Sequence, residues 1–427
     1  MNERRVLKDS TKSLCPRCYR EIPALIIEEG NGVYMEKSCP DHGSFRAMVE
    51  KDAFVYRTLM NYGSLPRRKI ALVIPITHRC NLRCKMCFLP DDGVPDPSQK
   101  AIFSLIDNFE GRIIFSGGEP TLRSDLPELI AYAAKQGKHT CIATNGLQLR
   151  EKKLVGSLAD AGLTNCLFSM NGLSDSIFEQ IEGQPLFQKK LSALENLRGT
   201  SIKPFLSTTV ISGVNTGELP ALADFYMTNR ALFFGWRLRT QAAIGKHTDA
   251  SNLWMSDMLN LVCNTLDIDR EKLLKSINPE QIYHGISHLY FNILTTVGKS
   301  RRTLGYRTID QRTYKNKDGG FQGDKQLSRT SFSQNFIEYA NLFWHSNKDL
   351  LSSMSFSQKI VGAFNRIFQP SRLKWYNINV FAWPDASNVD LEEMKQTGIY
   401  HVGPGGKPMP FVHAIILNNN KPDWNWE

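Results

Sequence analysis

Apolar and polar positions follow two rhythms between residue 69 and about residue 240. Short apolar runs of strand length alternate with stretches whose apolar residues recur at helical spacing. The runs predict strands at 69–77, 111–117, 139–144, 164–170, 203–211 and 232–239, with amphipathic helices at 124–136 and 151–162. Alternating strands and helices indicate parallel βα repeats, and therefore an α/β fold built as a partial (β/α)6 barrel or an open sheet. In either case ligands are expected at the carboxyl ends of the strands.

The two flanking regions lack this rhythm. Strand-like stretches at 23–29 and 32–37 leave residues 1–66 too few apolar positions for a core of their own. The C-terminal third holds one amphipathic pattern at 356–368, which we expect to pack on the barrel, with docking on a membrane surface as the alternative. We therefore predict a small domain at 1–66, a barrel at 67–245 and an α+β extension at 246–427 that binds substrate or acts as a lid.

Two close-spaced ligand pairs explain how the first region folds. Cys15 and Cys18 form one pair, and Cys39 and His42 form the second, in the pattern C-x2-C-x20-C-x2-H. This spacing is typical of a closed tetrahedral zinc site in a zinc ribbon, with rubredoxin-like mononuclear iron as the alternative. A structural metal would supply the stability that the short apolar stretches lack.

A second cysteine group follows the first predicted strand of the barrel. Cys80, Cys84 and Cys87 have a three-then-two spacing that suits three irons of a 4Fe–4S cluster. Full protein ligation of such a cluster takes four cysteines, so this loop would leave one iron open for chemistry. From spacing alone, a fourth ligand from His78 or Cys141 remains the alternative.

The segment SGGEPT, residues 116–121, follows the second predicted strand. Its glycines permit close approach of the backbone to a ligand, and Glu119 offers a carboxylate to a cation or an ammonium group. Together the cysteine loop and this segment resemble the radical S-adenosylmethionine (SAM) superfamily, over roughly residues 70–240.

The resemblance implies a cofactor arrangement and a reaction. The three cysteines would hold the 4Fe–4S cluster, SAM would chelate its open iron, and Gly117, Gly118 and Glu119 would meet the SAM amino group. A flavodoxin or ferredoxin would supply an electron, and cleavage of SAM would yield a 5′-deoxyadenosyl radical that removes hydrogen from an unactivated C–H bond. The cofactor carries this chemistry, so no acid–base residue is assigned. Further SAM contacts are expected from Met86, Phe88, Asn145, Ser169, Asn171 and Arg239.

The ends of the chain narrow the resemblance. The string around Cys15–His42 and the closing segment 388–411 resemble the subgroup that contains tetraether lipid synthase and the archaeal pterin methylating enzyme. That subgroup carries auxiliary-cluster cysteines where this chain has Thr397, Gly398 and Val412, so we expect no auxiliary cluster. Resemblance to this subgroup favours a function in C–C bond formation or alkylation of a lipid-like or small anionic substrate. The alternatives are radical oxidation or rearrangement of a peptide or metabolite and, outside enzymology, an iron–sulfur or zinc sensor or RNA-binding protein, which the intact SGGEPT disfavours.

The charge and composition of the chain say less about its function than the motifs do. Lysine and arginine exceed aspartate and glutamate by 52 − 42 = +10, and the window 299–329 holds nine basic residues against three aspartates. We expect a solvated loop there, or contact with an anionic substrate or lipid headgroup. Nucleic acid is disfavoured because basic and aromatic residues do not interleave.

Hydrophobic residues at 41% exclude wholesale disorder, and no apolar run approaches the ~18 residues of a membrane-spanning helix. The best apolar runs, 70–76 and 412–417, are of strand length. A polar N-terminus and clustered cysteines suggest a cytoplasmic protein with reduced thiols. Cys141, Cys166 and Cys263 are expected in the core, and His284 and His288 on a helix.

Overall fold

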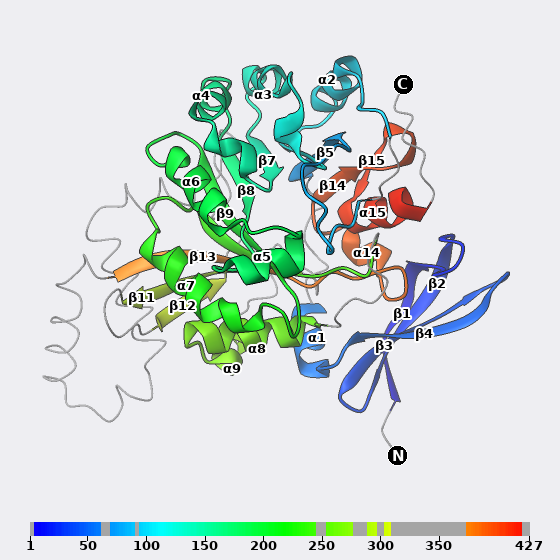
Figure 1. Cartoon of the computed structure of the whole chain (residues 1–427). Helices are drawn as coiled ribbons and strands as arrows, with labels where there is room; N and C mark the ends of the chain where they lie inside the picture. The colour runs from blue at the N-terminus through cyan, green and yellow to red at the C-terminus, as the bar shows by residue number, and fades with distance from the viewer. Residues whose placement is uncertain are drawn as a thin grey trace, which may run out of the picture.

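Two sheets organise the chain (Figure 1). The computed structural model describes residues 4–60, 69–89, 94–244, 253–275, 288–296, 303–308 and 373–420. An N-terminal antiparallel sheet has the strand order β1-β2-β3-β4, and the larger sheet has the order β12-β11-β13-β10-β9-β8-β7-β6-β5-β14-β15. The predicted helix at 356–368, His284 and most of the basic window lie outside the described residues.

The N-terminal sheet contains the expected strands as β2 (Glu21–Glu29) and β3 (Gly32–Cys39). It adds β1 (Arg4–Leu14) and β4 (Gly43–Glu50), which the pattern did not predict. Most side chains of β1 are polar and half-buried or exposed, so this strand shows little alternation, and its pairing with β2 defines it. Apolar residues of β2 and β3 join the main core together with α1 (Ala53–Met60).

Six parallel strands form the centre of the larger sheet and confirm the predicted order of strands. Neighbours pair in parallel from one end of the series to the other. Every residue of the first strand is buried, as expected where both faces of a parallel sheet are covered. The carboxyl ends of these strands meet at one edge, where the cysteine loop and SGGEPT both emerge. The strands are β5 (Ala71–Thr77), β6 (Arg112–Gly117), β7 (Thr140–Thr144), β8 (Asn165–Ser169), β9 (Lys203–Val210) and β10 (Gly235–Thr240).

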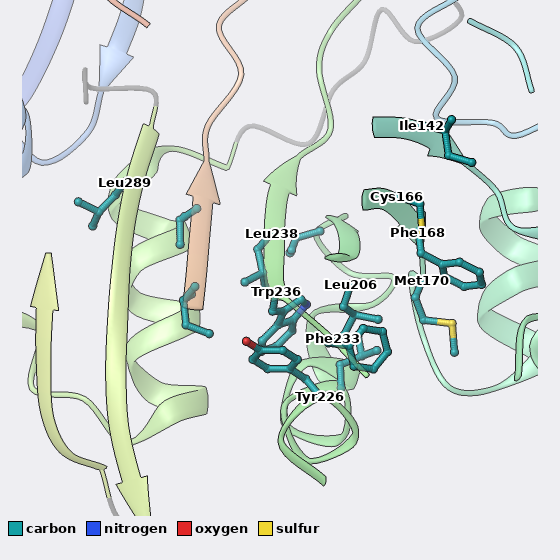
Figure 2. Packing of buried hydrophobic residues seen from close by; sticks show 14 of the residues in the cluster. Ile142, Cys166, Phe168, Met170, Leu206, Tyr226, Phe233, Trp236, Leu238 and Leu289 are labelled. Carbon is teal, nitrogen blue, oxygen red and sulfur yellow. The ribbon is translucent and has the colours of Figure 1, made fainter. Parts of the chain in front are cut away.

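Helices between these strands cover their outer side (Figure 1). The two predicted helices are present as α3 and α4, and each buries one apolar face, which in α3 includes Leu129 and Ile130. Figure 2 shows the apolar packing around Trp236, whose ring centroid lies 6.1 Å from that of Tyr226. The connecting elements are α2 (Gln99–Asp107), η1 (Pro120–Leu122), α3 (Leu126–Lys135), η2 (Leu147–Arg150), α4 (Lys152–Asp160), α5 (Asp175–Glu182), α6 (Phe187–Leu197), η3 (Thr216–Glu218) and α7 (Leu219–Thr228).

The C-terminal region widens the partial barrel at both edges. Next to β10 it adds β13 (Leu373–Phe381) in parallel, followed by the antiparallel strands β11 (His288–Thr296) and β12 (Thr303–Thr308). Next to β5 it adds β14 (Ile399–Val402) in parallel and then β15 (Pro408–Pro410). The remaining elements are α8 (Met255–Leu266), α9 (Arg270–Lys275), α14 (Leu391–Met394), η6 (Pro404–Gly406) and α15 (Phe411–Asn420).

Two expectations for this region are wrong. His288, which we expected on a helix, is the first residue of the strand β11, because pairing with Phe381 of β13 extends the strand to this position. The strand-length run 412–417 belongs to the helix α15, and its consecutive residues Val412 to Ile416 are all buried. A helix enclosed on several sides is apolar all round, and a short apolar run then cannot be told from a buried strand. Within the described ranges, no helix combines the length and apolar composition that crossing a bilayer requires.

The N-terminal sheet is fastened to the C-terminal region. Asp390, at the start of α14, accepts hydrogen bonds from Lys8 Nζ at 2.7 Å and from Thr11 Oγ1 at 2.6 Å. Buried Lys37 donates to the carbonyl of Ala386 at 2.8 Å. Leu14 packs in an apolar cluster with residues of α14 and α15. Segments far apart in sequence are therefore neighbours beside the barrel mouth.

Candidate active site and metal centre

The three cysteines of the second group lie on the loop that leaves β5. Cys84 and Cys87 are half-buried and Cys80 is exposed, and the three thiols are within electrostatic range of one another. Backbone bonds shape the loop: Cys87 N–H donates to Cys84 O at 3.2 Å, and Lys85 N–H donates to Ile181 O at 2.9 Å. Burial raises the pKa of the Cys84 thiol to about 12, so a thiolate there needs a nearby cation. Three soft sulfur donors on one loop fit an iron–sulfur cluster.

The glycines of SGGEPT bring β6 against the start of that loop. A Cβ on Gly117 would lie 2.1 Å from Thr77 O, and one on Gly118 would lie 2.3 Å from Arg79 O. Gly117 also has a φ of +122°, which favours glycine. Gly118 N–H donates to Thr77 O at 2.7 Å, and Glu119 N–H donates to Arg79 O at 2.8 Å. Only glycine fits both positions, and the close approach holds the two motifs together.

Glu119 is fully buried, and its carboxylate ties β6 to β7. Oε1 accepts from Thr121 Oγ1 at 2.6 Å, from Thr121 N–H at 3.2 Å and from Thr144 Oγ1 at 2.7 Å. Oε2 accepts from Asn145 N–H at 2.7 Å. Burial raises the pKa of Glu119, and these four donors oppose that rise. The expected contact with the SAM amino group stays a prediction, and it would be made by a carboxylate that the protein already holds in place.

The expected contacts at the ends of β7 and β8 lie at the same edge. Asn145 Nδ2 donates to Asn81 Oδ1 at 2.7 Å and so links β7 to the cysteine loop. Asn171 is completely buried, donating to Glu182 Oε1 at 2.8 Å and accepting from Thr209 N–H at 2.8 Å. Ser169 is half-buried. The structure therefore gathers these residues beside the loop, and their predicted roles in SAM binding remain untested.

Two residues at this edge escaped the sequence reasoning. Lys190 of α6 and Glu182 of α5 form a buried ion pair, with Nζ and Oε2 2.9 Å apart. Their signal was present in the pattern, because Lys190 shares the apolar face of its helix with Ala193, Leu194 and Leu197. A charged residue on a buried helix face needs a partner, and the ammonium group of Lys190 lies at the carboxyl ends of β7 and β8, where it contacts the carbonyls of Asn145 and Ser169.

A cavity opens beside the cysteine loop, and the space between its lining atoms is about 410 Å³ when the part open to solvent is included. Met86 and Phe88 line it from the loop, and Arg239 lines it from the end of β10. Trp383 and Phe411 form an aromatic wall from the C-terminal region, with ring centroids 5.1 Å apart. Other lining residues are Thr209, Thr240, Gln241, Ala242, Ile244, Val412 and Ile415.

Arg239 is the charged residue among the described residues that line this cavity. Its side chain is half-buried, and its Nε–H donates to Thr209 Oγ1 at 2.9 Å. Burial, together with the charge of Arg237, lowers the pKa of Arg239 to about 9, while the nearby Cys87 and Cys84 oppose the shift. A partly desolvated guanidinium that remains charged at neutral pH would attract an anionic group.

The first ligand group is assembled as predicted. The ligand atoms of Cys15, Cys18, Cys39 and His42 all lie within 4.8 Å of one another. His42 Nδ1 lies 3.7 Å from Cys15 Sγ and 3.4 Å from Cys39 Sγ, and the thiols of Cys18 and Cys39 are 3.9 Å apart. Burial raises the pKa of Cys15, but hydrogen bonds from Cys18 and Arg17 outweigh it and lower the pKa to about 6. The spacings and the available thiolate fit a tetrahedral zinc ion.

The remaining cysteines confirm the core prediction. Cys141, Cys166 and Cys263 are each 2% exposed or less. Cys141 points its thiol at the carbonyl of Ile142 inside the sheet, at 3.6 Å.

Comparisons with known proteins agree with these two sites. Residues 74–226 match the radical SAM superfamily, and residues 7–51 match the HMPTM N-terminal zinc ribbon domain. A 7,8-dihydro-6-hydroxymethylpterin dimethyltransferase from Methanocaldococcus jannaschii is 31% identical over 258 residues, which are 52% of this chain and 51% of the relative. A PqqA peptide cyclase from Bradyrhizobium diazoefficiens is 29% identical over 41% of this chain and 50% of the relative. The chain thus spans about half the length of these curated relatives.

Among solved structures, Streptococcus suis SuiB bound to the precursor peptide SuiA has 21% sequence identity and a TM-score of 0.41. The similarity covers 48% of this chain and 47% of that chain. Residues 74–226 thus form a radical SAM domain, and a zinc ribbon precedes it at residues 7–51.

Proposed function

We propose that this member of the radical SAM superfamily uses Cys80, Cys84 and Cys87 to bind one 4Fe–4S cluster, and that it generates a substrate radical. When bound, the cluster and SAM together would supply a 5′-deoxyadenosyl radical. The observation that carries the proposal is the close fit of SGGEPT against the cysteine loop, which Gly117 and Gly118 make sterically possible. Neither a sensor nor an RNA-binding module requires that junction.

The chain's own residues would bind and orient SAM and the substrate. SGGEPT and the carboxyl ends of β7 and β8 would hold SAM beside the loop, with Glu119 held in place by Thr121, Thr144 and Asn145. The aromatic wall of Trp383 and Phe411 would cover the cavity and exclude water from the reacting carbon. A flavodoxin or ferredoxin would deliver the electron.

The cavity supports a lipid-like or small anionic substrate. Its apolar and aromatic lining suits a hydrocarbon or planar group. Arg239, which the sequence resemblance assigns to SAM, would here bind one carboxylate or phosphate of the substrate instead. Val412, at a position where the resemblance would place an auxiliary-cluster cysteine, is itself part of the apolar lining. We therefore favour C–C bond formation or alkylation, as in the methyl transfer named for the pterin relative, performed without a second cluster.

Radical oxidation or rearrangement is the second candidate. The PqqA peptide cyclase supports it, since its name describes ring closure on a peptide. The absence of cysteine at Thr397, Gly398 and Val412 is also compatible with a reaction that needs no auxiliary redox centre.

The decisive experiment is anaerobic reconstitution followed by counts of iron, sulfide and zinc, and then addition of SAM and dithionite. We expect about four irons per chain at the cysteine loop and release of 5′-deoxyadenosine. Cys84→Ala should abolish that release, whereas the matched core variant Cys263→Ala should retain it. Equal release from wild type and Cys84→Ala would overturn the proposal.

The same assay addresses substrate class. Perdeuterated fatty acids, prenyl phosphates and a pterin phosphate would each be added in turn. Deuterium in 5′-deoxyadenosine identifies the molecule whose C–H bond is broken, and Arg239→Gln should weaken binding of the anionic probes. Incorporation from none of these amphipathic or anionic probes, but from a neutral peptide, would favour the second candidate.

A further inference from the structure

Stability alone does not explain the buried ion pair of Lys190 and Glu182 at the carboxyl ends of the strands. Lys190 is completely buried and Glu182 is 1% exposed. Removing two charges from water carries a desolvation cost that their attraction often fails to offset, and apolar residues of similar volume frequently serve stability as well. A pair in this setting therefore calls for another explanation.

The contacts of the ammonium group show where the pair acts. Lys190 Nζ donates to Ser169 O at 2.9 Å and to Asn145 O at 3.2 Å, in addition to Glu182. A lysine has three donors, so these acceptors match its capacity. Both carbonyls belong to residues at the ends of β8 and β7, where SAM contacts are expected. Lys190 thus fixes the backbone of two neighbouring strand ends.

The carboxylate of Glu182 is also held by a hydrogen bond, and it lies beside the cysteine loop. Asn171 Nδ2 donates to Glu182 Oε1 at 2.8 Å. The preceding residue, Ile181, accepts the hydrogen bond from Lys85 N–H, directly after Cys84. Glu182 is therefore one residue from the backbone hydrogen bond that holds the loop directly after Cys84.

We infer that Lys190 and Glu182 are positioning residues that set how readily the cluster at Cys80, Cys84 and Cys87 accepts an electron. The inference rests on the proposed function. Reduction adds one negative charge to the cluster, supplied by a one-electron donor such as dithionite or a ferredoxin, and no bond changes in that step. Lys190 favours the added charge, Glu182 opposes it, and the balance sets the reduction potential.

Replacement of Lys190 and replacement of Glu182 should shift the reduction potential of the cluster in opposite directions. A purely structural role for the pair predicts no such difference in sign. Lys190→Met leaves Glu182 unbalanced and should lower the ratio of reduced to oxidised cluster at the wild-type midpoint about tenfold, a shift of about 59 mV for one electron. Glu182→Gln keeps an oxygen for Asn171, leaves Lys190 unbalanced, and should raise that ratio by a similar factor. Lys190→Arg should stay near wild type.

The measurement is a redox titration of the reconstituted full-length protein, followed by electron paramagnetic resonance of the reduced cluster. Lys152→Met, an exposed lysine on α4, is the matched control and should leave the midpoint unchanged. Opposite shifts in Lys190→Met and Glu182→Gln support the inference. Unchanged midpoints in variants with full iron content, or shifts of the same sign in both, would overturn it.

Failure of the proposed function looks different. In that case the wild-type protein itself would take up no cluster, so there would be no midpoint to shift. If Lys190→Met does not fold, Glu182→Gln decides alone: a higher midpoint supports the inference, and an unchanged or lower one overturns it.

Discussion

Replacement of Gly118 by alanine tests the junction on which the proposed function depends. The added Cβ would lie 2.3 Å from Arg79 O, whereas ordinary contact begins at 3.4 Å. The blocking atom is a backbone oxygen at the start of the cysteine loop, so rotation of a side chain cannot relieve the clash. The loop and the end of β6 must separate by about 1 Å, a displacement that matters where reacting groups are positioned.

The expected magnitude follows from what that separation breaks. Two backbone hydrogen bonds cross the junction, from Gly118 N–H to Thr77 O and from Glu119 N–H to Arg79 O. Each contributes about 1 kcal/mol net, so the free energy of unfolding should fall by about 2 kcal/mol. A misplacement of about 1 Å costs about 100-fold in rate, so 5′-deoxyadenosine formation should fall about 100-fold in protein that remains folded.

Gly156→Ala provides the matched control. Gly156 lies inside α4 with nothing within 4 Å of its added Cβ, and glycine in a helix interior is less stable than alanine by about 0.5–1 kcal/mol. This variant should be slightly more stable and fully active. Thermal unfolding, iron content and 5′-deoxyadenosine release would be measured on both proteins. A Gly118→Ala protein with wild-type iron content and a wild-type rate would refute the reasoning.

Three further predictions concern the rest of the fold. Loss of the zinc ligands in the double variant Cys18→Ala/His42→Ala should remove zinc and lower the melting temperature; zinc or iron retained at this site by mass spectrometry would contradict the assignment. Burial lowers the pKa of His401 to about 4 in the folded protein, whereas a histidine in the unfolded chain has a pKa of about 6.5. As the pH falls from about 6.5 to about 4, the unfolded chain therefore binds a proton that the folded protein does not. The free energy of unfolding should fall by about 3 kcal/mol over that range. His401→Gln should therefore flatten the acid limb of stability against pH, and an unchanged limb would refute this. Ser256→Ala removes the hydroxyl donor to buried Glu50 and should cost about 1–3 kcal/mol in urea unfolding; no loss would show that the backbone donors suffice.

Most of the barrel could be predicted because its strands are buried on both faces. Strand β5 is buried at all its residues, so it appears in the sequence as an unbroken apolar run. The same reasoning failed for β1, whose side chains remain largely exposed, and for α15, in which residues 412–416 are all buried. In both cases the neighbouring elements determine the conformation, and a single-sequence pattern does not contain them.

The candidate site likewise contains some features that the sequence predicts and others that it does not. Cysteine and glycine motifs can be recognised from spacing, because their chemistry constrains residue type at fixed offsets. Asn171 shows the limit: its position after β8 was apparent, but its bonds to Glu182 and Thr209 depend on how three elements meet. Lys190 was visible only as a charge on an apolar helix face, and its acceptors come from two other strand ends.

The wall of the cavity links both metal centres through packing. Leu14 and Tyr19, on either side of Cys15 and Cys18, belong to the same apolar cluster as Phe88 from the loop that follows Cys87. Val412 and Ile415 of α15 complete that cluster and also line the cavity. Close-packed interiors transmit displacement, so the shape of the cavity depends on the fold of the zinc ribbon as well as on the barrel. An N-terminal domain with few apolar residues thereby contributes to the packing of the cavity wall, and loss of its metal would be expected to change the shape of the cavity.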